Sequence, residues 1–180
     1  MNYQLKQKII ANIREVPDFP IPGISFKDIT PILANPELCG DIAAELIEQL
    51  KPFQFDAIVG IESRGFLFSM LLAQKLSIPF VPIRKKGKLP WYTVEEEYDL
   101  EYGSECIQIH SDALKSGYRV LIHDDLLATG GTAVAACRLI EKLGAHVEAI
   151  AFLISLDFLP GRGRLLPYSS NIISLVAFNS

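Results

Sequence analysis

The sequence predicts a single α/β domain with a mostly parallel central sheet flanked by helices. Short apolar runs of strand length alternate with longer segments of helical period, and this order is typical of parallel strands joined by right-handed crossovers. The 180 residues, 49% of them hydrophobic, suit one domain with a substantial core. Neither an internal repeat nor a linker divides the chain. We therefore expect one domain over residues 1–180.

The N-terminal part is expected to contain two helices separated by a proline-rich turn. Residues 3–13 have the pattern of a short amphipathic helix, and the turn VPDFPIPGISF follows at 16–26. Asn35 and Pro36 mark the start of the second helix, because Asn caps a helix N-terminus and Pro suits the first helical position. This helix should run to about Leu50.

Three strands, one helix and one loop are expected in the middle of the chain. The first strand is DAIVGI (56–61), an apolar run too short for a typical helix, and a helix over GFLFSMLLAQKL (65–76) follows it. Further strands are expected at PFVPIR (79–84) and SECIQIH (104–110). Between them, residues 85–98 show no clean period and carry both basic and acidic clusters, which predicts a mobile loop.

The clearest unit is a strand, a turn and a helix in the second half of the chain. The strand is predicted over YRVLIHDD (118–125). The helix is predicted over 132–143, where apolar residues recur at i, i+3, i+4 and i+7 on one face. Gly144 ends this helix in the usual C-terminal role. The last two strands are expected at 146–155 and 171–178.

Ligands of parallel sheets bind at the carboxyl ends of the strands, where residues 60–65 and 123–132 should both lie. In the second segment a turn of small residues leads into a helix N-terminus, where backbone N–H groups and the helix dipole favour a phosphate. Asp124 and Asp125 would repel a phosphate that they faced, so they suit sugar hydroxyls or the outer shell of a hydrated Mg²⁺. Phosphate, vicinal hydroxyls and a metal together describe a ribose 5-phosphate. The phosphate-binding residues expected in the turn are Ala128, Thr129, Gly130, Gly131 and Thr132.

Bulk properties and missing motifs exclude several other classes. The net charge of −4 argues against broad nucleic-acid binding. The chain has neither a P-loop motif with its lysine nor a GxGxxG fingerprint. Its three cysteines lack metal-ligand spacing, and no segment forms an apolar signal core or approaches a membrane span. We therefore expect a cytoplasmic protein that binds neither nucleic acid nor membranes. The bland alternative for the two aspartates is that they only cap the turn.

Five segments carry a resemblance to a known family. The segment VLIHDDLLATGGTA (120–133) resembles the signature of the type I phosphoribosyltransferases, which bind 5-phosphoribosyl-1-pyrophosphate (PRPP). Four further blocks are similar to segments of the adenine phosphoribosyltransferases, and they come in the family's order. These blocks are FPIPGISFKDITPIL (19–33), GIESRGFLF (60–68), RKKGKLP (84–90) and YDLEYGSE (98–105).

The resemblance implies a type I phosphoribosyltransferase fold, with a hood over residues 1 to about 33 and a flexible lid over residues 85–98. The implied reaction transfers the phosphoribosyl group of PRPP to adenine and gives AMP and pyrophosphate. Mg²⁺ would be bound mainly through the substrate's phosphates and ribose hydroxyls, without protein ligands of its own. A homodimer is also implied, and Arg84, Trp91 and Tyr92 are compatible with a subunit interface.

For PRPP, the resemblance assigns the 5′-phosphate to the turn at 128–132, called the phosphate loop below, and the ribose hydroxyls to Asp124 and Asp125. Arg64 would reach the pyrophosphate, and a cis peptide bond is implied at Glu62–Ser63. The basic segment RKKGKLP would supply further cations for the pyrophosphate, with a solvated charge run as the alternative. These cations are Arg84, Lys85 and Lys88.

For adenine, the resemblance implies that Phe26 stacks on the purine ring while Leu126 covers its other face. Backbone groups near Ile24 would read the edge of the base, and Lys27 would help to bind the base or the phosphate. Glu101 would lie near the imidazole edge and assist proton movement as N9 attacks. A plain core role for Phe26 and a solvated role for Glu101 are the alternatives.

Two rival functions remain open from the sequence. One is a related enzyme that uses hypoxanthine, guanine or xanthine, although the segment FPIPGISF speaks against it. The other is a non-enzymatic regulator that keeps the ribose-phosphate site and binds nucleic acid, which would be expected to carry an added DNA-binding segment. The three histidines do not cluster, and His123 is expected as a buried imidazole with satisfied hydrogen bonds rather than a catalytic group.

Overall fold

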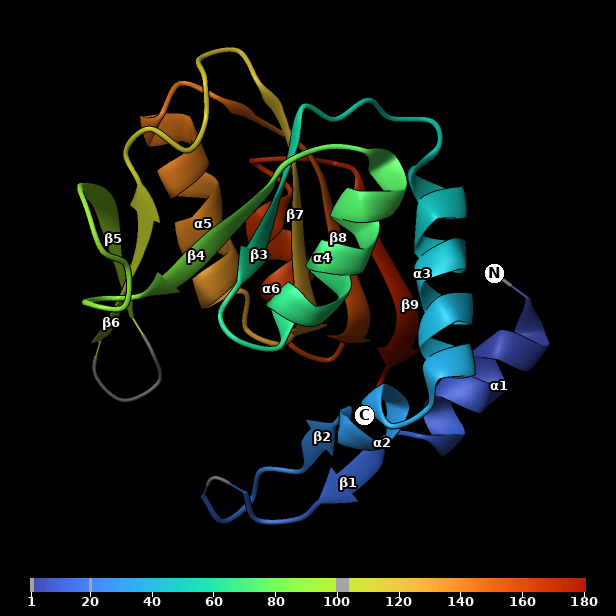
Figure 1. The fold of residues 1–180 in the computed structure, drawn as a ribbon. Coiled ribbons are helices and arrows are strands. Elements are labelled where there is room, and N and C mark those ends of the chain that lie inside the picture. The colour runs from blue at the N-terminus through green and yellow to red at the C-terminus, as the bar shows by residue number, and fades with distance from the viewer. Residues whose placement is uncertain (1, 20, 100–103) are drawn as a thin grey trace.

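The computed structural model describes residues 2–19, 21–99 and 104–180. Its main body is a seven-stranded sheet, and a separate two-stranded sheet lies in the hood (Figure 1). The order of strands across the main sheet is β5 (Thr93–Asp99), β6 (Ser104–His110), β4 (Phe80–Lys85), β3 (Ala57–Ile61), β7 (Arg119–Leu127), β8 (His146–Leu156) and β9 (Ile172–Phe178).

Five adjacent strands of the main sheet are parallel, which confirms the predicted sheet. They are β4, β3, β7, β8 and β9. β3 pairs with β4 on one side and with β7 on the other, and β8 and β9 continue from β7 in the same direction. The two strands at the far edge, β6 and β5, are antiparallel to their neighbours. Every strand that the apolar runs predicted is present within two residues of its expected bounds.

Helices cover both faces of the sheet (Figure 1). One core cluster joins the sheet to α3 (Pro36–Leu50) and α4 (Gly65–Leu76), with α1 (Tyr3–Ala11) packed on α3. The other joins the opposite face to α5 (Gly131–Lys142) and α6 (Gly161–Leu165). No helix in the described part of the chain is long and apolar enough to cross a membrane.

The helix boundaries follow from the signals in the sequence. Asn35 caps α3, because its side-chain oxygen accepts a hydrogen bond of 3.0 Å from the N–H of Leu38. The predicted helix over 65–76 is α4, and the helix predicted at 132–143 is α5, shifted by one residue. Gly144 follows α5 with a φ of +77°, in the left-handed conformation expected at a helix C-terminus.

The hood contains a small hairpin that the sequence analysis did not predict. Strands β1 (Arg14–Val16) and β2 (Phe26–Asp28) are antiparallel, with Val16 opposite Phe26, and the short helix α2 (Thr30–Leu33) follows. These strands have only three residues each and flank a turn rich in proline and glycine, so the sequence shows no strand pattern there. The hairpin projects beside the lower end of the main sheet (Figure 1) and carries Phe26 toward the loops there.

The prediction of an irregular loop over residues 85–98 is wrong for its second half, which forms β5. Val94 packs against the core. Glu96 is only 12% exposed because it forms ion pairs of 3.1 Å with Arg138 and 2.6 Å with Lys142, both on α5. Burial disfavours the charged form of Glu96, and its two cationic partners favour it. Neither effect can be inferred from the run of three glutamates in the sequence. The mobility expected of the lid stays a prediction.

Candidate active site

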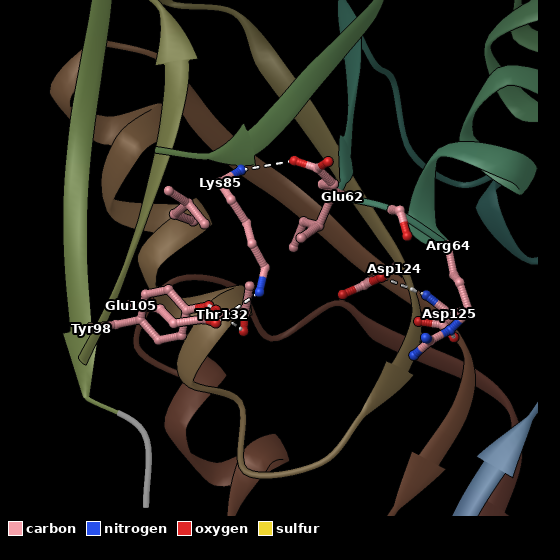
Figure 2. A pocket seen from close by; sticks show the side chains of 11 residues that line it. Glu62, Arg64, Lys85, Tyr98, Glu105, Asp124, Asp125 and Thr132 are labelled. Carbon is pink, nitrogen blue, oxygen red and sulfur yellow. Dashed lines mark hydrogen bonds and ion pairs between the residues drawn. The ribbon is translucent and has the colours of Figure 1, made fainter. Parts of the chain in front are cut away.

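A cavity of about 400 Å³ opens at the carboxyl ends of β3 and β7. The next strand after β3 in the chain, β4, lies on one side of it, whereas β7 lies on the other side. The strand order therefore reverses at β3, and ligands of such sheets bind at this switch point. Segments 60–65 and 123–132 both border this cavity, as predicted, and the β5–β6 ribbon forms its third wall. Figure 2 shows Arg64 and Asp125 on one side and Tyr98 and Glu105 on the other.

The phosphate loop surrounds a second, smaller hollow of about 100 Å³ that adjoins the cavity through Asp124. Gly130 has a φ of +80° and serves as the N-cap of α5, and its carbonyl accepts the first helical hydrogen bond from Val134 at 2.9 Å. The four N–H groups of residues 129–132 donate to no acceptor in the described part of the chain. Unpaired donors at a helix N-terminus are suited to binding an anion.

Asp124 and Asp125 end β7 next to this loop. The N–H of Asp125 donates to a carboxylate oxygen of Asp124 at 2.9 Å. Burial, together with the charge of Asp125, raises the pKa of Asp124 well above its usual range. Asp125 is itself 5% exposed at its side chain and forms an ion pair with Arg64. Asp124 therefore lies where the two hollows meet, and Asp125 lines the larger cavity beside it.

Arg64 joins three segments that are far apart in the sequence. Its Nε donates to Asp125, and its guanidinium carbon lies 5.1 Å from the centroid of the Phe26 ring. The arginine precedes α4, whose first residue, Gly65, packs against β7. A Cβ at Gly65 would lie 2.8 Å from a carboxylate oxygen of Asp124. The peptide bond between Glu62 and Ser63 is cis, as the resemblance implied.

The basic segment contributes one side chain to the cavity. Lys85 lines it and donates to Glu105 at 2.7 Å. Arg84 is turned to Glu62, with 2.9 Å between the two charged groups, and it also donates to the carbonyl oxygen of Lys88. The hydrogen bond from Arg84 lowers the pKa of Glu62. Neither Arg84 nor the side chain of Lys88 borders the cavity in this arrangement.

Sequence analysis missed two polar residues of the cavity wall, Tyr98 and Glu105. The hydroxyl of Tyr98 donates to Glu105 at 2.9 Å and accepts from the hydroxyl of Thr132 at 3.2 Å. Burial raises the pKa of Tyr98 to about 12, so the phenol keeps its proton. A chain of contacts thus runs from Lys85 to the phosphate loop (Figure 2). The alternation of Val94, Glu96 and Tyr98 was the signal that would have revealed this strand.

Only some of the residues predicted to bind adenine lie at the site. Phe26 faces Arg64 at the edge of the site, and Leu126 lines the smaller hollow. Ile24 is 39% exposed in the hood. Lys27 does not border the cavity, because its ammonium pairs with Glu15 and lies 4.8 Å from the centroid of the Phe178 ring. Glu101 lies outside the described residues.

His123 is buried as predicted, but its hydrogen bonds are not satisfied. Its side chain is fully enclosed, and both ring nitrogens lack a partner among the described residues. Burial lowers the pKa of His123 to about 4, and the neighbouring Ala151 backbone offsets this effect in part. The ring of Phe68 lies edge-on at 6.3 Å between centroids. The imidazole is therefore neutral at physiological pH.

No group of three or more acidic, histidine or cysteine side chains in the described segments is arranged to hold a metal ion. The two adjacent aspartates could contact a cation that is already coordinated by other oxygens. The chemical features of the site are thus a set of unpaired N–H donors, a pair of acids, two cations and an aromatic ring.

Comparison with known proteins gives consistent matches. Residues 27–169 match the family model described as phosphoribosyl transferase domain. An adenine phosphoribosyltransferase of Cytophaga hutchinsonii is 53% identical, over 97% of this chain and 96% of that protein.

Solved structures give the same result. The crystal structure of adenine phosphoribosyltransferase from Thermoanaerobacter pseudethanolicus superposes with a TM-score of 0.93 at 49% identity, covering 96% of this chain and 99% of that one. The Saccharomyces cerevisiae enzyme, complexed with adenine and an imino-altritol bisphosphate, superposes with a TM-score of 0.89 at 39% identity, over 97% and 99% of the two chains.

Proposed function

The chain belongs to the adenine phosphoribosyltransferases, within the phosphoribosyl transferase domain family, and from this premise we propose how its residues carry out the reaction. The enzyme transfers the 5-phosphoribosyl group of PRPP to N9 of adenine and releases AMP and pyrophosphate, a step of purine salvage. The observation that carries the assignment of roles is the row of unpaired N–H groups in the phosphate loop beside the two acids.

We assign the 5′-phosphate to the phosphate loop. The free N–H groups of residues 129–132 and the hydroxyls of Thr129 and Thr132 supply donors, and the N-terminus of α5 supplies a favourable dipole. Asp124 lines both this hollow and the larger cavity, Asp125 lines the larger cavity, and both accept hydrogen bonds from the ribose hydroxyls.

We assign the pyrophosphate to the larger cavity, between Arg64 and Lys85. Both cations are neutralised by acids in the structure, Arg64 by Asp125 and Lys85 by Glu105. Binding of PRPP exchanges these carboxylates for phosphate oxygens, which have a higher negative charge. Neither Arg84, which pairs with Glu62, nor Lys88 lines the cavity, so we assign both only a contribution to the positive potential near Lys85.

Adenine occupies the space next to Phe26, with Leu126 on the opposite face. The guanidinium of Arg64 lies over the ring of Phe26, so its movement toward the pyrophosphate makes one face of that ring accessible. Backbone groups near Ile24 contact the base edge, whereas Lys27 stabilises the hood through Glu15 and Phe178. Glu101 receives the proton that N9 loses.

The reaction requires positioning and electrostatic stabilisation rather than a protein nucleophile. As the bond from the anomeric carbon to pyrophosphate breaks, positive charge develops on the sugar and negative charge on the leaving group. The buried acids stabilise the first, and Arg64 with Lys85 stabilises the second. Asp124 and Asp125 would be the outer contacts of a Mg²⁺ ion held mainly by substrate oxygens, and such an ion would supply charge that neutralises the leaving group.

We further propose a cytoplasmic homodimer. The three cysteines are unpaired thiols, which suits a reducing compartment. Trp91 and Tyr92 are 76% and 73% exposed and contact each other edge to face at 5.3 Å between centroids. Exposed aromatic side chains next to arginine are enriched in protein interfaces. Sedimentation equilibrium tests this proposal, and a monomeric mass with full activity would contradict it.

A single assay tests the assigned reaction. Pyrophosphate release is measured with adenine, hypoxanthine, guanine and xanthine, each with PRPP and with or without Mg²⁺. We expect rapid release with adenine and Mg²⁺ and very slow release with the 6-oxopurines. Faster turnover of any 6-oxopurine than of adenine would contradict the proposed base site.

A further inference from the structure

The short helix α6 packs directly against the outer side of the phosphate loop. A Cβ built on Gly161, its first residue, would lie 2.1 Å from the carbonyl oxygen of Ala128. In the reverse direction, a Cβ on Gly130 would lie 2.9 Å from the Cα of Gly161. Two backbones therefore approach each other at this point more closely than any side chain allows. The contact joins backbone to backbone, so rotation of a side chain cannot relieve it.

A second contact follows one turn later. Nη1 of Arg164 donates a hydrogen bond of 3.1 Å to the carbonyl oxygen of Thr129. The next carbonyl, that of Gly130, accepts from the N–H of Val134 at 2.9 Å. Three successive carbonyls of the loop are thus turned toward protein groups: toward Gly161, toward Arg164 and toward the first turn of α5.

The planarity of the peptide unit gives these contacts a consequence on the other side of the loop. In a trans peptide the carbonyl and the following N–H point in opposite directions. When the carbonyls of residues 128–130 face α6 and α5, the N–H groups of residues 129–131 face away from them. Those are the N–H groups that have no acceptor in the described part of the chain.

We propose that Gly161 and Arg164 are positioning residues, which orient the phosphate loop so that its N–H groups converge on the 5′-phosphate. This inference rests on the proposed function, because it takes the ligand of the loop to be the phosphate of PRPP and AMP. Neither residue lines the hollow, so neither contacts the ligand. Arg164 also adds positive charge behind the loop, which favours the same anion.

The test compares two glycines of one helix. Gly161→Ala forces the loop backbone to move, whereas a Cβ on Gly163 meets nothing within 4 Å, so Gly163→Ala is the matched control. Dissociation constants are measured by calorimetry for AMP and ribose 5-phosphate, which carry the phosphate, and for adenine, which does not. Thermal unfolding is recorded for each variant to separate loop effects from loss of stability.

We expect Gly161→Ala to weaken AMP and ribose 5-phosphate by about a hundredfold or more, since several N–H contacts are misdirected together. Adenine binding should stay close to that of Gly163→Ala, whereas the melting temperature should fall, because the new Cβ must displace the Ala128 backbone and the side chain of Leu127.

Arg164 is tested by substitution with Gln and Lys. Arg164→Gln should weaken the phosphate ligands by about tenfold, and Arg164→Lys should restore part of that loss, because lysine also donates to a carbonyl. The charge control is Arg162→Gln, which removes a cation from the same helix without touching the loop; Arg162 donates to the carbonyl of Ile172 instead. Equal losses for the two glutamine variants would assign the effect to charge and overturn a positioning role for Arg164.

The outcomes separate the inference from the function on which it rests. A wild-type protein that binds neither AMP nor ribose 5-phosphate would contradict the proposed function. A wild-type protein that binds both, with Gly161→Ala indistinguishable from Gly163→Ala, would overturn the inference alone. A loss of adenine binding equal to the loss of AMP binding would show general disruption and would also overturn it.

Discussion

Replacing His123 by leucine should increase stability, and the gain should grow as the pH falls. In the folded protein the imidazole is fully enclosed, and both nitrogens lack a hydrogen-bond partner among the described residues. Burying such unpaired polar atoms costs free energy even in the neutral form. Leucine has a similar volume and fits the apolar environment next to Phe68.

The pH dependence follows from the two pKa values of the imidazole. In the unfolded chain His123 takes up a proton near pH 6.5, whereas burial lowers its pKa in the folded protein to about 4. Between these values the unfolded state binds more protons, so stability is lost as the pH falls through this interval. Since one pKa unit corresponds to about 1.4 kcal/mol, the wild type should lose roughly 3 kcal/mol between pH 7 and pH 4 through this residue.

Urea unfolding at several pH values between 7 and 4.5 provides the assay. The free energy of unfolding of His123→Leu minus that of the wild type should rise steadily toward low pH. His146→Gln is the matched control, because it removes a histidine that is exposed at the start of β8. A constant difference for His123→Leu over the same range would refute the reasoning, since it would mean that the buried imidazole titrates as it does in the unfolded chain.

Three further variants probe the active site. Phe26→Ala should raise the KM for adenine by about tenfold or more with little change in the melting temperature; a drop in stability alone would make Phe26 a core residue. Gly65→Ala should lower kcat/KM by about a hundredfold, because its Cβ would lie 2.8 Å from a carboxylate oxygen of Asp124 and displace it; wild-type kinetics would show that α4 can shift freely. Tyr98→Phe removes the hydroxyl between Thr132 and Glu105, so the KM for PRPP should rise severalfold while circular dichroism is unchanged; an unchanged KM would exclude a role for this contact.

The segments that could be predicted are those where local pattern and tertiary position agree. The unit from β7 to α5 is one example, because its apolar run, its small-residue turn and its helical period are contiguous in the sequence. The turn at 128–132 was located from the same stretch, and it precedes α5 as predicted. In each case the physical requirement, an anion-binding turn at a helix start, is met by neighbouring residues.

The features that escaped prediction depend on partners distant in sequence. β5 contains three consecutive glutamates, and Glu96 can face inward only because Arg138 and Lys142 on α5 meet it there. Tyr98 enters the cavity wall for the same reason, since the strand positions it. The pairing of Lys27 with Glu15 depends on a hairpin of three-residue strands, which no local signal predicted.

The ion pair between Arg64 and Asp125 has a consequence for how the empty enzyme discriminates among cellular phosphates. A free pyrophosphate or inorganic phosphate that attracts Arg64 leaves Asp125, only 5% exposed at its side chain, without a counter-charge. Under the roles proposed for the site, we expect PRPP to avoid this penalty, because its ribose hydroxyls would reach the aspartate while its pyrophosphate reaches the arginine. We therefore expect the Arg64–Asp125 pair to favour a ligand that presents both groups on one molecule, and free pyrophosphate or inorganic phosphate, which presents only one of them, to bind more weakly.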